Sequence, residues 1–281
     1  MNTLRHQKCP LCFDANIYKI GDIAYHTPVM FSTHVIEISN TPEYWKCNKC
    51  GSSFVQNIIP EKKIIELYSF GSSSNRWSKI PFQEVKSKNI LNALGKLFEN
   101  NVKVLDIGCN TGLLLDFAKS KGCITTGVEY SEESRNQAIE KGHRCVSSIV
   151  EIDETFDVIT AFDLVEHLYD CSGFFRFCRD HLKRNGKLAI LTGNMNSISA
   201  IISRSNWWYI KYPEHIIFPS KKYYKNFSGF ALNKWILTYA AVGYKNPISK
   251  IINKEIYNQI YNGQYIGLPS IGPDHVLVVL E

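Results

Sequence analysis

The sequence lacks the features that mark membrane-spanning, secreted and low-complexity proteins. Its 281 residues contain no run of 18 or more apolar residues, so we expect no transmembrane helix. The first ten residues have no apolar core of the kind found in a secretory signal. No internal repeat and no long low-complexity tract is present. Together with 44% hydrophobic and 21% charged residues, these absences predict an ordinary globular protein.

A disulfide framework is also not expected. The chain has nine cysteines, an odd number, in a sequence far longer than the usual disulfide-rich domain. Reduced thiols and a cytoplasmic location are the natural interpretation. The formal net charge of +6 permits an anionic substrate but does not require one.

Four of the cysteines form two C-x-x-C pairs, separated by 47 − 12 = 35 positions: Cys9, Cys12, Cys47 and Cys50. Four thiolates suit one closed, tetrahedral Zn²⁺ site. The gap is longer than in a compact ribbon, and alternating segments such as 31–38 lie between the pairs, so we predict a zinc-ribbon-like domain over residues 1–60 with an enlarged hairpin. Redox-active or merely buried cysteines are the alternative. His26 and His34 are rival ligands without a knuckle context.

Residues 102–116 are the segment around which the rest of the chain is placed. A short apolar run, Val102 to Ile107, is typical of a strand buried on both faces of a parallel sheet. It stops at Gly108-Cys109-Asn110-Thr111-Gly112, where the backbone can turn sharply, and a leucine-rich helix pattern follows. In open α/β sheets, ligands bind beyond the carboxyl end of such a strand.

The glycine pattern favours one nucleotide-type ligand over another. A dinucleotide site needs G-x-G-x-x-G, and its last position is occupied here by Leu113, which counts against NAD. The pattern Asp106-x-Gly108-x-Asn110-x-Gly112 instead resembles motif I of class I S-adenosylmethionine (SAM)-dependent methyltransferases. The resemblance implies that Gly108 and Gly112 let the backbone approach the amino-acid part of SAM, near Asp106. Asn110 replaces the family's middle glycine.

Further cofactor-binding residues follow in the order that the resemblance implies. Glu129 ends a second strand 129 − 106 = 23 positions after Asp106, where a carboxylate accepts both ribose hydroxyls. The resemblance places the next candidates around the adenine and at the end of a fourth strand over 156–162: Tyr130, Ser147 (or Ser148), Phe162 and Asp163.

A helical linker over residues 61–100 is expected to cover the cofactor. Helix patterns span 61–70 and 82–98, and Tyr68 and Arg76 loosely match the aromatic and arginine that cover SAM in related enzymes. Packing of both residues against the core is the alternative.

An aromatic-rich stretch near 193–220 is predicted to form an acceptor lid, because loops after the fifth strand face the methyl group in this fold. Its His215 is our candidate for the base that removes an acceptor proton, with His167 of the Glu166-His167 pair as the second candidate and ~6.5 as the ordinary pKa of either ring. Anchoring the lid is the alternative role of His215. Ser220 is expected to cap a helix that runs to about Ala241, before final strands near 244–252 and 275–280.

The sequence therefore predicts an α/β protein with a Rossmann-like seven-stranded methyltransferase sheet over 101–281 and a small zinc-ribbon domain. Ribbon-plus-methyltransferase chains resemble the branch that modifies sugars and polysaccharides, so the expected reaction is SAM-dependent methylation of a carbohydrate hydroxyl. The alternatives are an RNA methyltransferase, a non-catalytic SAM-fold module and an NAD oxidoreductase. Nucleic acid is not expected as a partner, because the single basic run with interleaved aromatics is 221–225.

Overall fold

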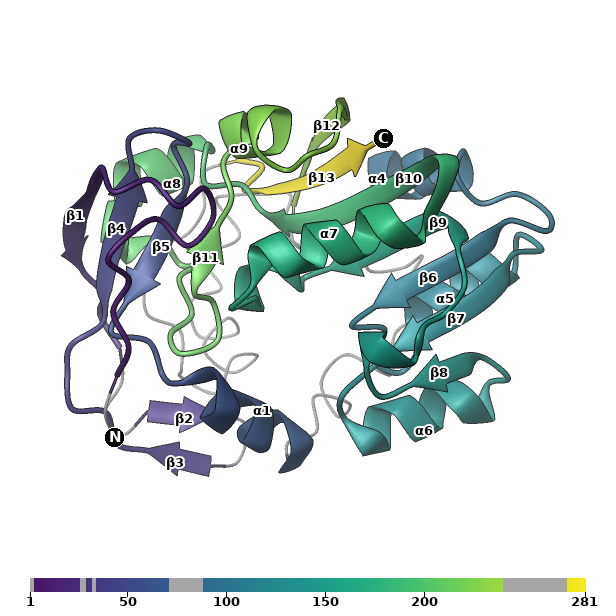
Figure 1. Ribbon diagram of the computed structural model, residues 1–281, viewed down its shortest axis with the longest axis horizontal. Helices are drawn as coiled ribbons and strands as arrows, with labels where there is room; N and C mark the ends of the chain where they lie inside the picture. Colours follow the sequence, from purple (N-terminus) through teal and green to yellow (C-terminus); the bar gives the residue numbers. More distant parts are fainter. Residues whose placement is uncertain (1–2, 26–28, 32–33, 71–87, 240–271) are drawn as a thin grey trace.

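The computed structural model describes residues 3–25, 29–31, 34–70, 88–239 and 272–281. Two sheets dominate this part of the chain, a small one near the N-terminus and a large one that carries most of the remaining residues (Figure 1). No helix among the described residues is long and apolar enough to cross a membrane.

The large sheet has seven strands. They lie in the spatial order β12 (Leu232–Thr238), β13 (His275–Leu280), β10 (Leu182–Gly193), β9 (Phe156–Phe162), β6 (Lys103–Ile107), β7 (Ile124–Val128) and β8 (Arg144–Val146). Neighbouring strands from β10 to β8 run parallel, whereas β13 is antiparallel to both β10 and β12. This order confirms the predicted Rossmann-like methyltransferase sheet.

Helices cover both faces of this sheet. α4 (Lys88–Gly95) and α5 (Leu113–Lys119) pack with one set of strand side chains, including Val104 and Leu191. α7 (Cys171–His181) packs on the opposite face, with Leu105 and Ile190 among its neighbours. Successive strand residues point to opposite faces of the sheet. Because helices cover both faces, adjacent residues such as Val104 and Leu105 are both apolar, and each packs on a different face. Five further helical segments lie between Glu132 and Asn206: α6 (Glu132–Glu140), η1 (Ile149–Glu151), η2 (Val165–His167), α8 (Ile198–Ser203) and η3 (Arg204–Asn206).

The small sheet combines the N-terminal segment with a strand from far along the chain. Its order is β1 (Ile17–Asp22), β4 (Glu43–Cys47), β5 (Ser53–Gln56) and β11 (Ile217–Phe218). Figure 1 shows β11 beside β5, on the side of this sheet that faces the methyltransferase part. Strands β2 (Val29–Phe31) and β3 (His34–Ile36), which lie between β1 and β4 in the sequence, pair antiparallel as a separate two-stranded sheet.

The prediction of a long helix from Ser220 to about Ala241 is mostly wrong. Ser220 does cap a helix, but α9 (Lys221–Asn226) is only six residues long. Gly229, with a φ of +79°, breaks the helical backbone soon after it, and the chain continues as β12, which is antiparallel to β13. The strand at 275–280 is confirmed, whereas residues 244–252 lie outside the described part.

The linker is described in part. α1 (Glu61–Phe70) confirms the first predicted helix, and α4 is the described portion of the second. Arg76 and residues 82–87 lie outside the described residues, as do His26 and the side chains of His34 and Tyr68. The proposed cover of the cofactor by Tyr68 and Arg76 therefore falls on side chains outside the described part.

Candidate functional site

The glycine-rich turn lies at the carboxyl end of β6, as predicted. Gly108, Asn110 and Gly112 have φ angles of +78°, +48° and +79°. The left-handed region is open to glycine and tolerated by Asn, which explains why these residue types recur at alternate positions. The backbone N–H of Gly108 donates to the carbonyl oxygen of Val128 over 2.8 Å, and this bond ties the turn to the end of β7.

Glu129 follows β7 and is held against the turn by its own carboxylate. One oxygen accepts the backbone N–H of Asn110 over 3.0 Å, and the other accepts that of Ser131 over 2.8 Å. A carboxylate has about four acceptor sites, so each oxygen keeps capacity for another donor. Burial raises the pKa of this carboxyl, while the backbone donors oppose the shift. The structure thus brings Glu129 and the turn together as the sequence predicts.

Asp106, at the carboxyl half of β6, is buried inside the sheet. Its carboxylate accepts a 2.6 Å hydrogen bond from the hydroxyl of Thr160 on β9. Burial raises the pKa of Asp106 to about 7, the negative charge of Glu129 adds to this effect, and the Thr160 bond opposes it. A nearby cation would favour the ionised form of this carboxyl.

The remaining cofactor candidates lie at the same edge of the sheet. Tyr130 is 56% exposed beside Glu129. Ser147 follows β8, and its hydroxyl donates to Glu151 over 2.6 Å, so this side chain already has a local acceptor. Phe162 is half-buried at the end of β9, and Asp163 is exposed with a φ of +52°, which turns the chain out of the strand.

A buried acid–base cluster follows directly on this edge. Ligand-type atoms of Glu166, His167 and His215 lie within 4.8 Å of one another. The carboxylate of Glu166 is fully buried and accepts hydrogen bonds from the hydroxyls of Tyr209 and Thr192, the latter over 2.9 Å. Burial raises the pKa of Glu166. His215 comes from the predicted lid, so the structure unites residues almost fifty positions apart.

Both imidazoles are oriented by backbone carbonyls. Nδ1 of His215 lies 2.6 Å from the carbonyl oxygen of Tyr209, and Nδ1 of His167 lies 2.9 Å from that of Glu214. A carbonyl oxygen only accepts, so Nδ1 of each ring carries a proton, and Nε2 of His215 is the nitrogen that can accept one. Burial, with the neighbouring His167 and Lys211, lowers the pKa of His215 well below its ordinary value. The expectation of titration near ~6.5 is therefore wrong for His215.

The aromatic residues of the insertion do not present free faces for stacking on an acceptor. Trp207, Trp208, Tyr209 and Phe218 are each at most 4% exposed and belong to the main core. Their burial between the two sheets corrects the prediction of an aromatic lid. Tyr212 is half-buried, and its ring lies 6.0 Å from that of Tyr25 in the N-terminal segment.

Sequence reasoning missed the supports of this cluster. Tyr209 and Thr192 hold Glu166, and the ring of His275 lies edge-on to Tyr209 with centroids 4.8 Å apart. Thr192 is the second-last residue of β10 and His275 is the first of β13, so the pairing of these two strands brings them to the same place. The Glu166-His167 pair was the one local signal of the cluster.

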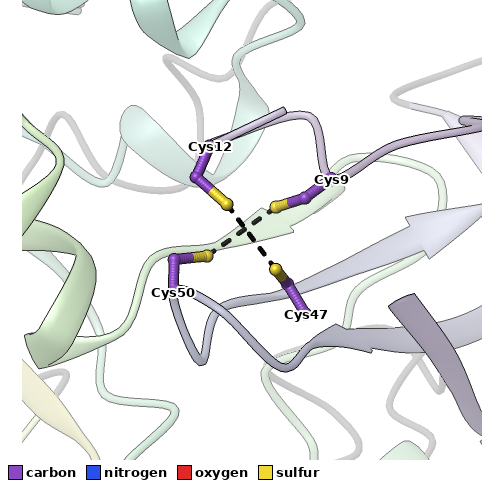
Figure 2. A group of neighbouring side chains, drawn as sticks. All are labelled: Cys9, Cys12, Cys47 and Cys50. Atoms are coloured by element: carbon purple, nitrogen blue, oxygen red, sulfur yellow. Dashed lines mark hydrogen bonds between the residues drawn. The ribbon is translucent and has the colours of Figure 1, made fainter. Parts of the chain in front are cut away.

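The four N-terminal cysteines converge, as the two C-x-x-C pairs predict. Figure 2 shows their side chains pointing toward a common centre, with Sγ–Sγ distances of 3.7 Å for Cys9–Cys50 and 3.6 Å for Cys12–Cys47. All four Sγ atoms lie within 4.8 Å of one another, and all four are free thiols. Tetrahedral Zn–S bonds of ≈ 2.3 Å place sulfurs about 3.8 Å apart, so this spacing fits one ion.

Three features define a fold of the SAM-dependent methyltransferase type: the order of the strands in the large sheet, the glycine-rich turn after β6 and the acidic Glu129 after β7. Residues 79–228 match the family model described as "Methyltransferase domain". This match covers 228 − 79 + 1 = 150 of the 281 residues, more than half, and the chain belongs to this family.

Curated relatives carry one recurring name. A "Ubiquinone biosynthesis O-methyltransferase" of Idiomarina loihiensis is 31% identical over 159 residues, which cover 50% of this chain and 63% of the relative. Its namesake from Bradyrhizobium diazoefficiens is 37% identical over 116 residues, which cover 38% and 44%. The chain thus spans less than two thirds of these relatives. A solved magnesium protoporphyrin IX methyltransferase from Synechocystis PCC 6803 aligns over 79% of this chain and 97% of its own, at 11% identity and a TM-score of 0.49.

Proposed function

We propose that this protein is a SAM-dependent methyltransferase that methylates a hydroxyl group of a small molecule, with His215 as the base. The observation that carries the proposal is the pair of backbone-anchored imidazoles beside a buried carboxylate. This cluster follows β9 at the same sheet edge as the glycine turn. The catalytic residue is His215, and His167 is the alternative.

The residues of the turn fit the cofactor. Gly108 and Gly112 give the turn its left-handed backbone, and Glu129 offers spare acceptor capacity to two ribose hydroxyls. Asp106 would face the cationic amino-acid end. When bound, SAM supplies an electrophilic methyl group. The proposed outer contacts are Asn110, Tyr130, Ser147, Phe162 and Asp163, with Tyr68 and Arg76 as the cover from the linker.

The cluster suits proton removal from a neutral hydroxyl. A hydroxyl must lose its proton as its oxygen gains the methyl group, and Nε2 of His215 is the atom proposed to accept it. Glu166 lies close enough to favour the imidazolium that results. Its coupling to Tyr209 and Thr192 keeps it fixed while the proton moves.

A carbohydrate hydroxyl is the proposed acceptor. Support comes from the sequence alone, in which a segment with two C-x-x-C pairs precedes the methyltransferase motifs, an organisation that resembles the sugar-modifying branch. The relatives named O-methyltransferase support oxygen as the receiving atom, but the words "ubiquinone biosynthesis" in their name point to a quinone precursor. An aromatic hydroxyl is therefore the second candidate.

The four cysteines are proposed to hold one structural Zn²⁺. Thiolates are soft ligands, and four of them leave no open position for chemistry. The metal would join two turns of the N-terminal domain over residues 1–60: the turn of Cys9 and Cys12 before β1, and the turn of Cys47 and Cys50 before β5. Retention of reduced thiols also supports the cytoplasm as the compartment.

An acceptor screen tests the proposal. Purified protein is incubated with methyl-labelled SAM and either nucleotide-linked hexoses or 3,4-dihydroxybenzoate, and product is read by mass spectrometry. Label on the hexose supports the carbohydrate acceptor, and label on the catechol ring supports the second candidate. Failure of SAM and S-adenosylhomocysteine to bind in calorimetry would overturn the cofactor and the function together.

A further inference from the structure

The small N-terminal sheet reaches the acid–base cluster through the residues that follow His215. Ile217 pairs with Phe54, and Phe218 pairs with Ser53, which makes β11 the fourth strand of that sheet. One residue earlier, the backbone of Ile216 is bonded on both sides. Its N–H donates to the carbonyl oxygen of Glu166, and its carbonyl oxygen accepts from Val55, both over 2.8 Å.

The C-terminal end of the same short segment is fastened by Ser220. Its hydroxyl donates to the carbonyl oxygen of Cys50 over 2.6 Å, and its backbone N–H donates to the hydroxyl of Ser52 over 3.0 Å. Ser52 and Cys50 are fully buried, and Ser220 is 2% exposed. Ser220 therefore contacts the turn that carries the second cysteine pair, and solvent does not compete for these bonds.

The His215 backbone is held from two sides. Its own N–H donates to the carbonyl oxygen of Lys211 over 2.9 Å within the insertion, and the residues after it are bonded to other parts of the chain. The ring is oriented by Tyr209, which is within the insertion, but the chain on its other side is anchored to the N-terminal sheet by Val55, Ser52 and Cys50. Only five positions separate His215 from Ser220. A shift of the Cys47–Cys50 turn would thus be passed to the histidine through a short segment that is paired with β5 at Ile217 and Phe218.

We propose that Ser220 is a positioning residue that fastens the His215 segment to the cysteine-bearing turn, so that the N-terminal sheet forms part of the catalytic site. The inference rests on the proposed role of His215 as base. It predicts that the bond from Ser220 to Cys50 governs the environment of the His215 ring, while the SAM-binding turn at the other sheet edge is unaffected.

The test compares Ser220→Ala with two matched variants. Ser220 also caps α9 by accepting the N–H of Tyr223, and Ser197 caps α8 in the same way through Ala200, without any bond to the N-terminal sheet. Ser197→Ala therefore controls for the loss of a cap. Ser220→Thr keeps a hydroxyl and should restore the wild-type behaviour. Ser52→Ala removes the acceptor of the Ser220 N–H and leaves the α9 cap intact. This variant replaces Ser220→Ala in the test if Ser220→Ala does not fold.

The readout is the titration of His215 by NMR of histidines labelled at Cε1, assigned with His215→Gln. The ionisable groups around this ring are His167, Lys211, His275, Glu166 and Tyr209. In the wild type and in Ser197→Ala, His215 should titrate well below ~6.5. In Ser220→Ala and Ser52→Ala its titration should move toward that value as the site opens to water. S-adenosylhomocysteine affinity should stay within about twofold in all variants.

Equal titration of His215 in Ser220→Ala and Ser197→Ala would overturn the inference. The measurement needs no acceptor, so it separates the inference from the proposed function. If His215→Gln retains methyl transfer, the base assignment fails, while the NMR result still shows whether Ser220 controls the ring.

Discussion

The imidazole rings of His167 and His215 stand perpendicular, with centroids 4.7 Å apart and an interplanar angle of 89°. Each is held by a different carbonyl group, and the protonation of one opposes that of the other, because like charges at this distance repel. His167 therefore adds to burial in lowering the pKa of His215, which keeps Nε2 of His215 available to accept a proton.

Replacement of His215 tests which ring is the base. His215→Gln should lower kcat roughly 10²–10⁴-fold, the usual contribution of a general base. Because burial lowers the pKa of His215, the acidic limb of the wild-type kcat profile should lie below ~6.5. Activity should then be lost only at lower pH, where the ring becomes protonated. A comparable loss in His167→Gln, with activity retained in His215→Gln, would transfer the role to His167.

Glu129 should contribute to cofactor affinity. Glu129→Gln keeps the size of the side chain but replaces one acceptor oxygen with a donor, so SAM binding should weaken by roughly 1.5–3 kcal/mol. Calorimetry with SAM measures this directly. Glu133→Gln, in the first turn of α6, is a suitable control because it also removes one negative charge nearby. Equal affinity of wild type and Glu129→Gln would remove Glu129 from the site.

Asp106 should couple SAM binding to pH. Its pKa is raised to about 7, so a large share of the carboxyl is protonated in the free protein at neutral pH. Cationic SAM favours the ionised form, so affinity should rise between about pH 6 and about pH 8, with release of a proton. Calorimetry in buffers of different ionisation enthalpy detects that proton. In Asp106→Asn the pH dependence should be absent, and a wild-type profile that is flat would contradict the placement.

Metal analysis tests the cysteine site. Protein purified without chelator should contain about one zinc per chain, because four thiolates form one closed site. Cys50→Ser should lose the metal and disturb the N-terminal sheet, while SAM binding persists. Cys178→Ser, a buried cysteine in α7, should keep the metal. Full zinc content in Cys50→Ser would contradict a site that depends on all four thiolates.

Two glycines offer a matched test of packing beside the cofactor turn. A Cβ at Gly127 on β7 would lie 2.5 Å from Sγ of Cys109 and 3.0 Å from Sγ of Cys145, whereas one at Gly95 in α4 would have no heavy atom within 4 Å. Gly127→Ala should therefore destabilise the fold by about 1–3 kcal/mol through overpacking. Gly95→Ala should be neutral or stabilising by up to ~1 kcal/mol. Urea unfolding of both variants provides the comparison.

The parallel part of the large sheet could be predicted because its signals are local. The apolar run before Gly108, the acidic residue after β7 and the cap at Ser131 each depend on neighbours within a few positions. The cysteine cluster was predictable for the same reason, since each C-x-x-C pair indicates a metal knuckle by itself. These elements match the structure closely.

The segment from Ser220 onward could not be predicted in this way. The sequence of β12, Leu232 to Thr238, has no strict alternation, and half-buried Trp235 and Ile236 are adjacent. Its strand conformation follows from pairing with β13, some forty positions away. The pairing of Ile217 with Phe54 and the burial of Trp207 likewise depend on contacts across the whole chain, which no local pattern encodes.

The remote strand in the small sheet also has a consequence for synthesis of the chain. β5 ends at Gln56 and β11 begins at Ile217, so 217 − 56 = 161 positions separate β5 from its outer partner. During translation the edge of β5 stays open until that partner has left the ribosome, and open apolar edges promote misassociation. At ≈ 5–20 residues per second, this interval lasts roughly ten to thirty seconds. Nascent chains halted before residue 217 should thus be more prone to aggregate than chains halted after α9.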